Sequence, residues 1–596
     1  MIALDHIRTI LATDCGSTTT KAILIERING SYRLTSRGEA PTTVEAPYDD
    51  VTIGVANATR EIEELTKRTI LDRDGRMITP TNADGHGVDI YLSTSSAGGG
   101  LQMTVAGVVR AMSAESAERA ALGAGAIVID VVAINDGRKD HEKIARIRAL
   151  RPDMILMAGG TDGGTQTHLV ELAELLRSAD PKPRLGAGLP IPVIYAGNID
   201  AAESVKSLIG DVVSFRAVPN VRPDMATENL APARDAIHDL FLEHVMQQAP
   251  GYSRLMEWTD ADIISTPNAV GLIMEAVAHE RKIDVLGVDI GGATTDVFSV
   301  FDGTFNRSVS ANLGMSYSIC NVLVEAGLSQ ISRWLTFQSD EVVLRNQLRN
   351  KMIRPTTIPQ TLRDLALEHA VAREALHRAF SHHKSLARSL VGVRAAGNVE
   401  FEREATGQSL VKLFALNLII GSGGVLSHAP HRAQAMHIML DAFEPQGVTM
   451  LAVDSIFMMP HLGVLSQTLP EAATEVFDRD CLIKLGDVVS PVGIAPTNAQ
   501  CLNVEIEGMA PFAVSVGKLQ LVNVPSGEMR RARLTPSKRF DLGNGRGVPL
   551  DCTLEGGEVG LVIDTRGRPL QIATDREQRR LQMVSWTQAM GLTPAE

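Results

Sequence analysis

Residues 9–26 read TILATDCGSTTTKAILIE, two apolar, β-prone runs joined by a turn rich in Gly, Ser and Thr. The first run ends at Asp14. A turn at Asn29-Gly30 leads to a third run, YRLTSRG, and Asn-Gly between apolar runs favours a tight hairpin. The sequence therefore predicts three strands joined by two turns over residues 9–38.

A second stretch repeats this design at residues 284–300, DVLGVDIGGATTDVFSV. Asp289 ends its first apolar run, a Gly-Gly-Ala-Thr-Thr turn follows, and Asp296 opens the second run. An Asp-Gly turn at 302–303 then leads onward. The two Asp-ending strands indicate a distant internal duplication in which each copy is a three-stranded unit. Two matched hairpins of this kind predict two half-domains that face one cleft.

Residues 103–262 follow a different rhythm, in which apolar runs alternate with stretches of helical patterning. The predicted strands are AIVIDVVAI (126–134), MILMAGG (154–160), PVIYAGN (192–198) and VVSFRAV (212–218). Fully apolar strands that alternate with helices predict a parallel sheet covered on both faces. This stretch therefore reads as an inserted α/β subdomain.

The remainder of the chain changes character twice. Helical patterning dominates residues 316–330 and 340–415, with a break around Pro355 and Pro359. Short β-prone runs from 481 to 572 then predict a small all-β domain, which a helix near 575–590 closes. These shifts divide the chain into a first half with the first Gly/Thr turn (1–102), the inserted subdomain (103–262), a second half (263–480) and a C-terminal β-rich segment (481–596).

Composition argues against several classes of function. The chain has 596 residues with a formal net charge of −13, and only 4% of its residues are aromatic. An acidic balance argues against general DNA binding or an anionic membrane surface, and few aromatics argue against base stacking. No apolar run is long enough to span a membrane, and the five cysteines form no C-x-x-C pair. We therefore expect a cytoplasmic protein without nucleic-acid or membrane partners.

The two turns, DCGSTTTK at 14–21 and DIGGATTD at 289–296, have the composition of phosphate-binding loops. Gly lets the backbone approach a phosphate closely, Ser and Thr add hydroxyl donors, and successive turn N–H groups form an anion nest. A carboxylate at the strand end would hold Mg²⁺ through its waters, since magnesium dehydrates reluctantly. Neither turn has Walker A spacing. A third apolar strand runs into a Gly cluster in LIIGSGGVLSHAP (418–430), which suits a nucleotide or anion contact.

The order of these three pieces resembles the actin, Hsp70 and sugar-kinase superfamily of ATPases. Within it, DCGSTTTKAILIE followed by GEAPTTVEAP looks like the glutamate mutase accessory proteins called MutL or GlmL, which are unrelated to the mismatch-repair MutL. The likeness extends over most of the chain, including AGGTDGG (158–164) and EGGEVGLVIDTRGRPL (555–570). It implies an α/β fold: a duplicated actin/Hsp70-like (ribonuclease H-like) ATPase core, with an inserted α/β subdomain and a small C-terminal β domain.

The resemblance also implies a function. The family's genes are associated with adenosylcobalamin-dependent carbon-skeleton mutases such as glutamate mutase. The chain would then be a reactivating chaperone that uses ATP and Mg²⁺ to release damaged cofactor from a mutase subunit. The identity of the mutase, the oligomeric state and any cobalamin binding by the chain itself stay open.

By position, the resemblance gives each loop a role. Asp14, Asp289 and Asp296 would surround Mg²⁺ and the attacking water, with Asp14 and Asp289 holding the ion through water. We favour Asp289 over Asp296 as the residue that orients the attacking water. The residues that would hold the phosphates are Gly16, Ser17, Thr18, Thr19, Lys21, Gly291, Gly292, Thr294 and Thr295. The residues that would flank the adenosine are Gly421, Gly423 and Gly424.

Other function classes share the ATP motifs. A small-molecule kinase would need a polar substrate pocket with a base near the γ-phosphate, and the sequence has no sugar-kinase signature beyond the shared motifs. ATP-dependent hydrolases resembling hydantoinase or oxoprolinase subunits carry similar turns, in which Gly-Gly is followed by Ala or Ser and then by Thr-Thr-Asp. Activators of 2-hydroxyacyl-CoA dehydratases begin with a similar loop but hold an iron–sulfur cluster, and the isolated cysteines here argue against one.

Three further features are ambiguous in the sequence. AGGTDGGT (158–165) follows a predicted strand, where open α/β sheets bind ligands, and would hold a substrate, a cobalamin-related group or nothing. Four histidines in the helical region are expected on a solvated face: His369, His377, His382 and His383. Cys15 is expected to act as a small residue that fills the first loop.

Overall fold

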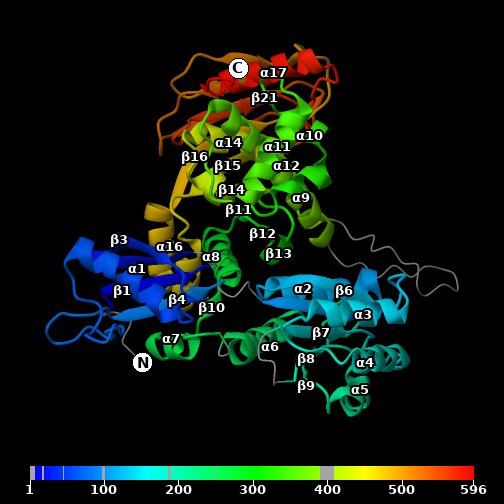
Figure 1. Ribbon diagram of the computed structural model, residues 1–596. Helices are drawn as coiled ribbons and strands as arrows, with labels where there is room; N and C mark the ends of the chain where they lie inside the picture. The colour runs from blue at the N-terminus through cyan, green and yellow to red at the C-terminus, as the bar shows by residue number, and fades with distance from the viewer. Residues whose placement is uncertain are drawn as a thin grey trace. The chain divides into compact units, whose positions relative to one another are not determined.

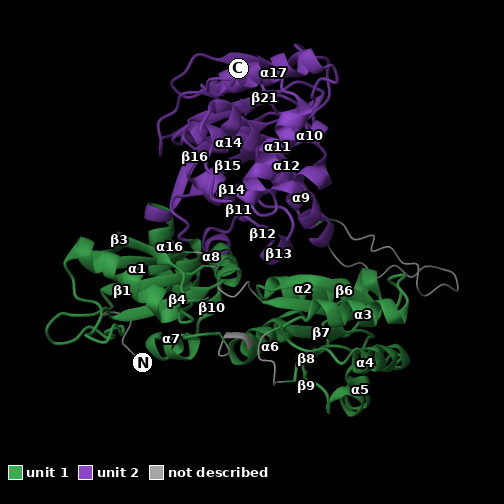
Figure 2. Cartoon of the chain, in the orientation of Figure 1, with its two compact units in different colours: residues 1–276, 388–409, 459–479 green, residues 277–387, 410–458, 480–596 purple. Residues whose placement is uncertain are grey.

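The computed structural model describes residues 7–16, 19–44, 46–96, 101–184, 190–246, 249–388 and 409–596. The chain divides into two compact units (Figure 2). Unit 1 comprises residues 1–276, 388–409 and 459–479, and unit 2 comprises residues 277–387, 410–458 and 480–596. Each unit is therefore built from three separate stretches of chain.

The first sheet of unit 1 contains the N-terminal hairpins (Figure 1). Its strands are β1 (Thr9–Cys15), β2 (Thr19–Ile28), β3 (Ser31–Pro41), β4 (Ile90–Ser95) and β10 (Ile264–Ser265). They lie in the order β3-β2-β1-β4-β10, with β2 antiparallel to both neighbours and β4 parallel to β1 and β10. The helix α1 (Val51–Thr66) packs on β2 and β3. The three strands predicted over residues 9–38 are confirmed.

The second sheet of unit 1 is wholly parallel. Its strands are β5 (Gln102–Gly107), β6 (Ile127–Ala133), β7 (Met154–Ala158), β8 (Pro192–Tyr195) and β9 (Ser214–Ala217). They lie in the order β6-β5-β7-β8-β9, so the predicted parallel sheet is confirmed, although β5 escaped prediction. The helices of this region are α2 (Glu115–Gly123), α3 (Asp140–Leu150), α4 (Thr167–Ala179), α5 (Ala202–Ile209), α6 (Ala231–Phe241) and α7 (Tyr252–Trp258).

This parallel sheet is covered on both faces, as apolar strands require. On β7, Leu156 belongs to the core that includes α2 and α6. Ile155 and Met157 on the same strand belong to a second core that includes α3, α4 and α5. Successive side chains of one strand thus face opposite helical layers, because side chains alternate along a strand.

Unit 2 is built on a mixed sheet of eight strands. Its first five strands are β11 (Asp284–Ile290), β12 (Thr295–Phe301), β13 (Thr304–Ser310), β14 (Leu416–Ser422) and β15 (Gly447–Asp454). They lie in the order β13-β12-β11-β14-β15, with β12 antiparallel to both neighbours and β14 parallel to β11 and β15. This order and these directions repeat the first sheet of unit 1. The molecule is therefore an α/β protein in which one sheet design occurs twice.

Helices gather on one face of the sheet of unit 2. They are α9 (Ile319–Ala326), α10 (Leu328–Ser332), α11 (Glu341–Ile353), α12 (Leu362–Leu386), α13 (Gly424–Ser427) and α14 (Arg432–Phe443). Pro355 and Pro359 lie between α11 and α12, as the predicted break requires. The helical pattern predicted up to residue 415 ends earlier, because α12 ends at Leu386 and residues 409–415 are not helical; the part at 389–408 lies outside the described residues.

The expectation that the histidines form a solvated face is wrong for two of them. His369 and His383 are 7% and 0% exposed. The ring nitrogens of His383 lie 2.8 Å from the Ser299 hydroxyl and 3.0 Å from the Ser308 hydroxyl. Burial lowers the pKa of His383 to about 3, so this ring is neutral and structural at neutral pH.

The expected separate C-terminal β domain needs correction. Three of its strands complete the large sheet of unit 2 beyond β15: β16 (Leu482–Ser490), β24 (Leu561–Asp564) and β20 (Leu519–Val522). On β16, Val488 belongs to the helical core and Val489 to a second core. A strand that is buried on both faces needs a packing layer against each face, and a small detached domain would not provide both layers.

The remaining C-terminal strands form the other wall of that second core. A four-stranded sheet contains β18 (Gln500–Ile506), β19 (Phe512–Ser515), β21 (Met529–Pro536) and β23 (Leu550–Glu555), and a short pair contains β17 (Val492–Gly493) and β22 (Phe540–Asp541). The predicted closing helix is confirmed as α17 (Arg576–Ala589). The four domain boundaries drawn from the sequence stay a prediction.

Buried charges fix the segment after β24 to the helices of unit 2. Arg566 is 0% exposed and donates to Asp441 at 2.6 Å and to Asp564 at 2.8 Å. Arg373 of α12 donates to the other oxygen of Asp441 at 2.6 Å. Although burial alone raises the pKa of Asp441, His437 and these guanidinium groups hold it at about 2. Each charge in this network is therefore paired with an opposite one.

Two helices of the second half return to unit 1. They are α15 (Met459–Thr468) and α16 (Pro470–Val476), which pack on β1, β4 and β3. Gly463 of α15 lies against α8 (Thr266–Arg281), where a Cβ would be only 1.8 Å from the Ala269 carbonyl oxygen. Among the described residues, no helix is long and apolar enough to cross a membrane.

Candidate nucleotide-binding site

Asp14 is the second-last residue of β1, and its side chain is 2% exposed. One carboxylate oxygen accepts hydrogen bonds from the Thr94 hydroxyl at 2.8 Å and the Thr266 hydroxyl at 2.6 Å. Thr94 lies on the neighbouring strand β4, and Thr266 begins α8. Two hydroxyl donors from separate elements thus fix the orientation of a buried carboxylate at the end of the sheet.

The first loop turns tightly after Asp14. The Gly16 N–H donates to the Thr19 carbonyl at 3.1 Å, and a Cβ on Gly16 would lie 2.6 Å from that oxygen. The Thr42 hydroxyl donates to the Gly16 carbonyl at 2.8 Å and lies 3.0 Å from the Thr20 hydroxyl. Glycine is therefore required here by close packing, and the threonines hold the loop backbone.

Two residues expected to bind phosphate, Ser17 and Thr18, lie outside the described residues. Lys21 lies on β2 directly opposite Asp14. Its carbonyl oxygen is 3.4 Å from Nε2 of His461 on α15. The segment 459–479 therefore contacts the strand that follows the first loop.

The second loop repeats the first in backbone detail. The Gly291 N–H donates to the Thr294 carbonyl at 2.9 Å, which matches the bond between Gly16 and Thr19. Asp289 lies opposite Asp296 across β11 and β12, just as Asp14 lies opposite Lys21. The same turn therefore follows the same strand in both units.

A segment that the sequence analysis missed supports the second loop. The carbonyl of Gly292 accepts the N–H of Ser316 at 2.9 Å and the N–H of Ser318 at 3.3 Å. A Cβ on Gly314 would lie 2.5 Å from that same carbonyl. Residues 313–318 therefore hold the loop backbone in place through hydrogen bonds and close packing at the Gly292 carbonyl. The signal available in the sequence is the run LGMSYS (313–318), which places a glycine and two serines shortly after β13.

The two carboxylates of the second loop have different surroundings. Asp296 is 8% exposed and accepts from Arg307 of β13 through Nε at 3.0 Å and Nη2 at 2.5 Å. Arg307 is itself 3% exposed, so the two form a buried ion pair. Asp289 is half-buried. Asp296 therefore pairs with Arg307, and Asp289 is the more accessible of the two carboxylates.

The third loop packs directly on the second. Gly423 has a φ of +99°, and a Cβ there would lie 2.2 Å from the Ile290 carbonyl oxygen. A Cβ on Gly421 would lie 2.8 Å from Leu426, whereas nothing lies within 4 Å of one on Gly424. Two glycines therefore serve close packing, and Gly424 leaves open space beside the backbone.

We expect Gly423→Ala to lower the free energy of unfolding by about 1–3 kcal/mol, because it adds a Cβ at a positive φ and against Ile290. The matched Gly424→Ala change should stay within about 0.5 kcal/mol. Urea unfolding of both variants measures the difference. Equal effects at the two positions would contradict the packing described for this loop.

The polar atoms around these loops fit a bound nucleotide and its magnesium. The hydroxyls of Ser422 and Ser427, on either side of the third loop, are buried without a hydrogen-bond partner. No cluster of three or more metal-binding side chains occurs among the described residues. Magnesium in phosphate sites needs only one or two carboxylates, since water and phosphate supply the other ligands. Asp14 and the two threonines beside it suit such a water-mediated site.

Cys15 occupies the end of β1 as a buried side chain. Burial and the neighbouring Asp14 raise the pKa of its thiol to about 12. We expect iodoacetamide at about pH 8 to leave Cys15 unmodified in the folded chain, because the reactive thiolate is nearly absent. Peptide mass spectrometry checks this, with the half-buried Cys320 as the internal comparison. Labelling of Cys15 as fast as Cys320 would be inconsistent with this burial.

The Gly-rich segment 158–165 joins three loops of the parallel sheet. Asp162 accepts from the Ile199 N–H at 3.0 Å and from the Asn220 side chain at 2.9 Å. Asp200 accepts from the Gly163 N–H at 3.0 Å. These hydrogen bonds hold the segment to the loops after β8 and β9, which gives it a structural role.

Comparison with known proteins places this chain in a family. The family model for MutL protein matches residues 10–481. Protein MutL of Clostridium tetanomorphum is 28% identical over 496 residues, covering 79% of this chain and 98% of the relative.

Likeness to solved structures is weak. A nucleotide-free acetone carboxylase gives a TM-score of 0.29 at 11% identity and covers 85% of this chain and 81% of its own. An activator of the 2-hydroxyisocaproyl-CoA dehydratase from Clostridium difficile, with bound ADPNP, gives 0.27 at 10% identity and covers 79% and 97%. Likenesses at this level carry no argument about this chain. The family model, in contrast, spans most of the sequence, and the chain belongs to the MutL family.

Proposed function

We propose that this chain is a Mg-ATP-dependent accessory protein that reactivates an adenosylcobalamin-dependent mutase, such as a glutamate mutase, by releasing damaged cofactor. The observation that carries the proposal is the repeated loop in a MutL-family chain. Both units place an Asp at the end of the first strand and close the following turn with the same Gly-to-Thr hydrogen bond. One such turn has many uses, whereas two in equivalent places suit the phosphates of a nucleotide.

Each loop has a distinct task in this proposal. The turn N–H groups of Gly16, Gly291 and Gly292, with the threonine hydroxyls, would bind phosphate oxygens. Asp14 and Asp289 would accept hydrogen bonds from waters on magnesium, and the ion would neutralise charge that develops on the phosphates. Gly421, Gly423 and Gly424 would lie beside the adenosine.

Asp289 is our choice for the residue that orients the attacking water. Asp296 already accepts two bonds from Arg307 and is poorly suited to exchange partners during a reaction. Catalysis would then consist of positioning and electrostatic stabilisation, as for phosphoryl transfer in general. Hydrolysis changes the charge held by loops of the chain, which allows nucleotide state to alter affinity for a protein partner.

A pull-down of the tagged chain from native extract, with Mg-ATP and with Mg-ADP, tests the proposal. We expect a cobalamin-dependent mutase subunit to be enriched in one nucleotide state only. The coupling should be about 1–3 kcal/mol, or roughly 5- to 150-fold in affinity. ATP hydrolysis without any nucleotide-dependent protein partner would favour a small-molecule kinase or an ATP-dependent hydrolase instead.

A further inference from the structure

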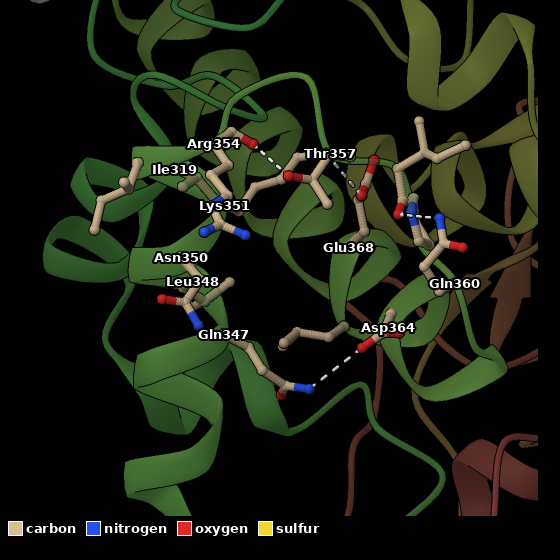
Figure 3. Close-up of a pocket in the computed structure, with 14 residues that line it drawn as sticks. Ile319, Gln347, Leu348, Asn350, Lys351, Arg354, Thr357, Gln360, Asp364 and Glu368 are labelled. Atoms are coloured by element: carbon tan, nitrogen blue, oxygen red, sulfur yellow. Dashed lines mark hydrogen bonds and ion pairs between the residues drawn. The ribbon is translucent and has the colours of Figure 1, made fainter.

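A pocket of about 540 Å³ lies in the helical part of unit 2. Side chains of α11, the start of α12 and the connection between them surround it (Figure 3). Its floor is apolar, since Ile319, Leu348 and Leu367 are buried to within 4%. A hollow of this size with an apolar floor and a polar edge has the character of a binding site.

The rim of the pocket exposes large apolar side chains. Ile353 at the end of α11 and Ile358 in the following connection line the pocket, yet they are 70% and 69% exposed. Leu362, which begins α12, is 55% exposed. Large apolar side chains exposed at the edge of a hollow are typical of surfaces that a partner covers.

The acidic groups of the pocket are already engaged within the chain. Glu368 pairs with Lys351 at 3.4 Å, and burial raises the pKa of Glu368. Asp364 accepts from the Thr361 hydroxyl at 2.8 Å as part of the cap of α12, and from the Gln347 side chain at 3.3 Å. Figure 3 shows the contact between Gln347 and Asp364 at the edge of the hollow.

The basic groups of the rim are different. No acidic side chain of the described chain lies within ion-pair distance of Arg349 or Arg354. Arg354 lines the pocket, and Arg349 lies on α11 between two residues that do. The chain as a whole carries a net charge of −13, so two unneutralised arginines beside exposed isoleucines stand out as a local positive rim.

We propose that this groove docks an amphipathic helix with acidic flanks from a partner protein. An amphipathic helix places apolar residues three or four positions apart on one face, which suits a hollow bordered by Ile353 and Ile358. Carboxylates beside that face would pair with Arg349 and Arg354. The inference stands on unit 2 alone and does not depend on ATP binding.

The pocket is also joined to the second loop through continuous structure. Ile319 lines the pocket and begins α9, and its N–H donates to the Ser316 carbonyl at 3.2 Å. Ser316 and Ser318 in turn donate to the Gly292 carbonyl. A helix docked against Ile319 would therefore contact the residue that directly follows this segment.

Binding of designed peptides to the full chain tests the docking surface without nucleotide. The probe is a fluorescein-labelled helical peptide of about 18 residues, with leucines on one face and glutamates beside them. The comparison peptides replace glutamate with lysine or scramble the order. We expect the acidic peptide to bind at least about tenfold more tightly than either one, measured by fluorescence anisotropy.

Exposed-site variants assign the binding to the groove. Ile353→Asp and Ile358→Asp should each weaken binding of the acidic peptide by about tenfold or more. Ile494→Asp is the matched control, since Ile494 is 72% exposed in the same unit and does not line the pocket. Arg354→Glu should lower the preference for the acidic over the lysine peptide. Because all four side chains are exposed, these variants should fold normally.

Two results would overturn the proposal. The first is equal binding of the three peptides, or binding that Ile353→Asp and Ile494→Asp affect alike. The second is a concentration-dependent dimer of the chain alone, seen by sedimentation velocity and abolished by Ile353→Asp. That dimer would assign the groove to a second copy of the chain.

Discussion

Replacing Asp289 with Ala should lower the rate of Mg-ATP hydrolysis by about 100-fold or more, with little effect on folding. Removal of one group that is aimed at charge developing in a transition state commonly has an effect of this size. Asp289 is half-buried near the end of β11, so its truncation should cost less stability than the loss of a fully buried carboxylate. Steady-state phosphate release, measured at saturating Mg-ATP, gives the comparison.

The control for this variant is Asp551→Ala. Asp551 lies in the four-stranded sheet of the same unit, and its side chain is 69% exposed in a surface pair with Arg533. We expect its ATP turnover to match the unmodified chain. If Asp289→Ala retained both ATP turnover and the rescue of a mutase, the assignment of the site would be wrong.

Replacing Asp296 with Asn should act mainly on stability. The change removes the carboxylate charge that pairs with the Arg307 guanidinium, which is 1% exposed. Breaking a buried ion pair from one side costs about 3–5 kcal/mol in unfolding free energy, because a charge stays buried and uncompensated. Urea unfolding, followed by hydrogen exchange in β12 and β13, measures the loss.

A double variant separates structure from chemistry at this position. Asp296→Leu together with Arg307→Met removes both charges, and much of the lost stability should return, since apolar replacements of buried pairs are often neutral. Normal unfolding of Asp296→Asn with abolished ATP turnover would instead return Asp296 to a chemical role. We therefore expect replacement of Asp289 to lower ATP turnover and replacement of Asp296 to lower the free energy of unfolding.

Local patterning predicted the repeated hairpins well. The apolar runs that lead to Asp14 and Asp289 are each followed by Gly and Thr residues. The apolar pattern and the turn residues therefore both predict a hairpin. The sequence predicts phosphate contacts for Gly16 and adenosine contacts for Gly423. The structure adds that each also sits where a side chain would collide with backbone.

Long-range pairing explains what the sequence did not reveal. The partner of Asp296 is Arg307, which reaches across from β13, and nothing in the local pattern marks an arginine in a strand as buried. His383 reads as polar helix surface, yet α12 turns it toward Ser299 and Ser308. Similarly, the sequence makes β16 look like the first strand of a new domain. Only the observed sheet order shows that β16 lies beside β15 and extends the large sheet.

The separate stretches that make up unit 1 have a consequence for synthesis on the ribosome. The sheet of β1–β4 lies near the start of the chain, but α15 and α16, which pack on it, arrive only with residues 459–479. A nascent chain therefore carries an uncovered apolar surface through most of its translation. The residues that cover it include Leu462, Leu465 and Val476, all fully or almost fully buried in the finished protein. Truncations that stop before residue 459 expose this surface permanently, so they should aggregate during expression even though the N-terminal strands are intact.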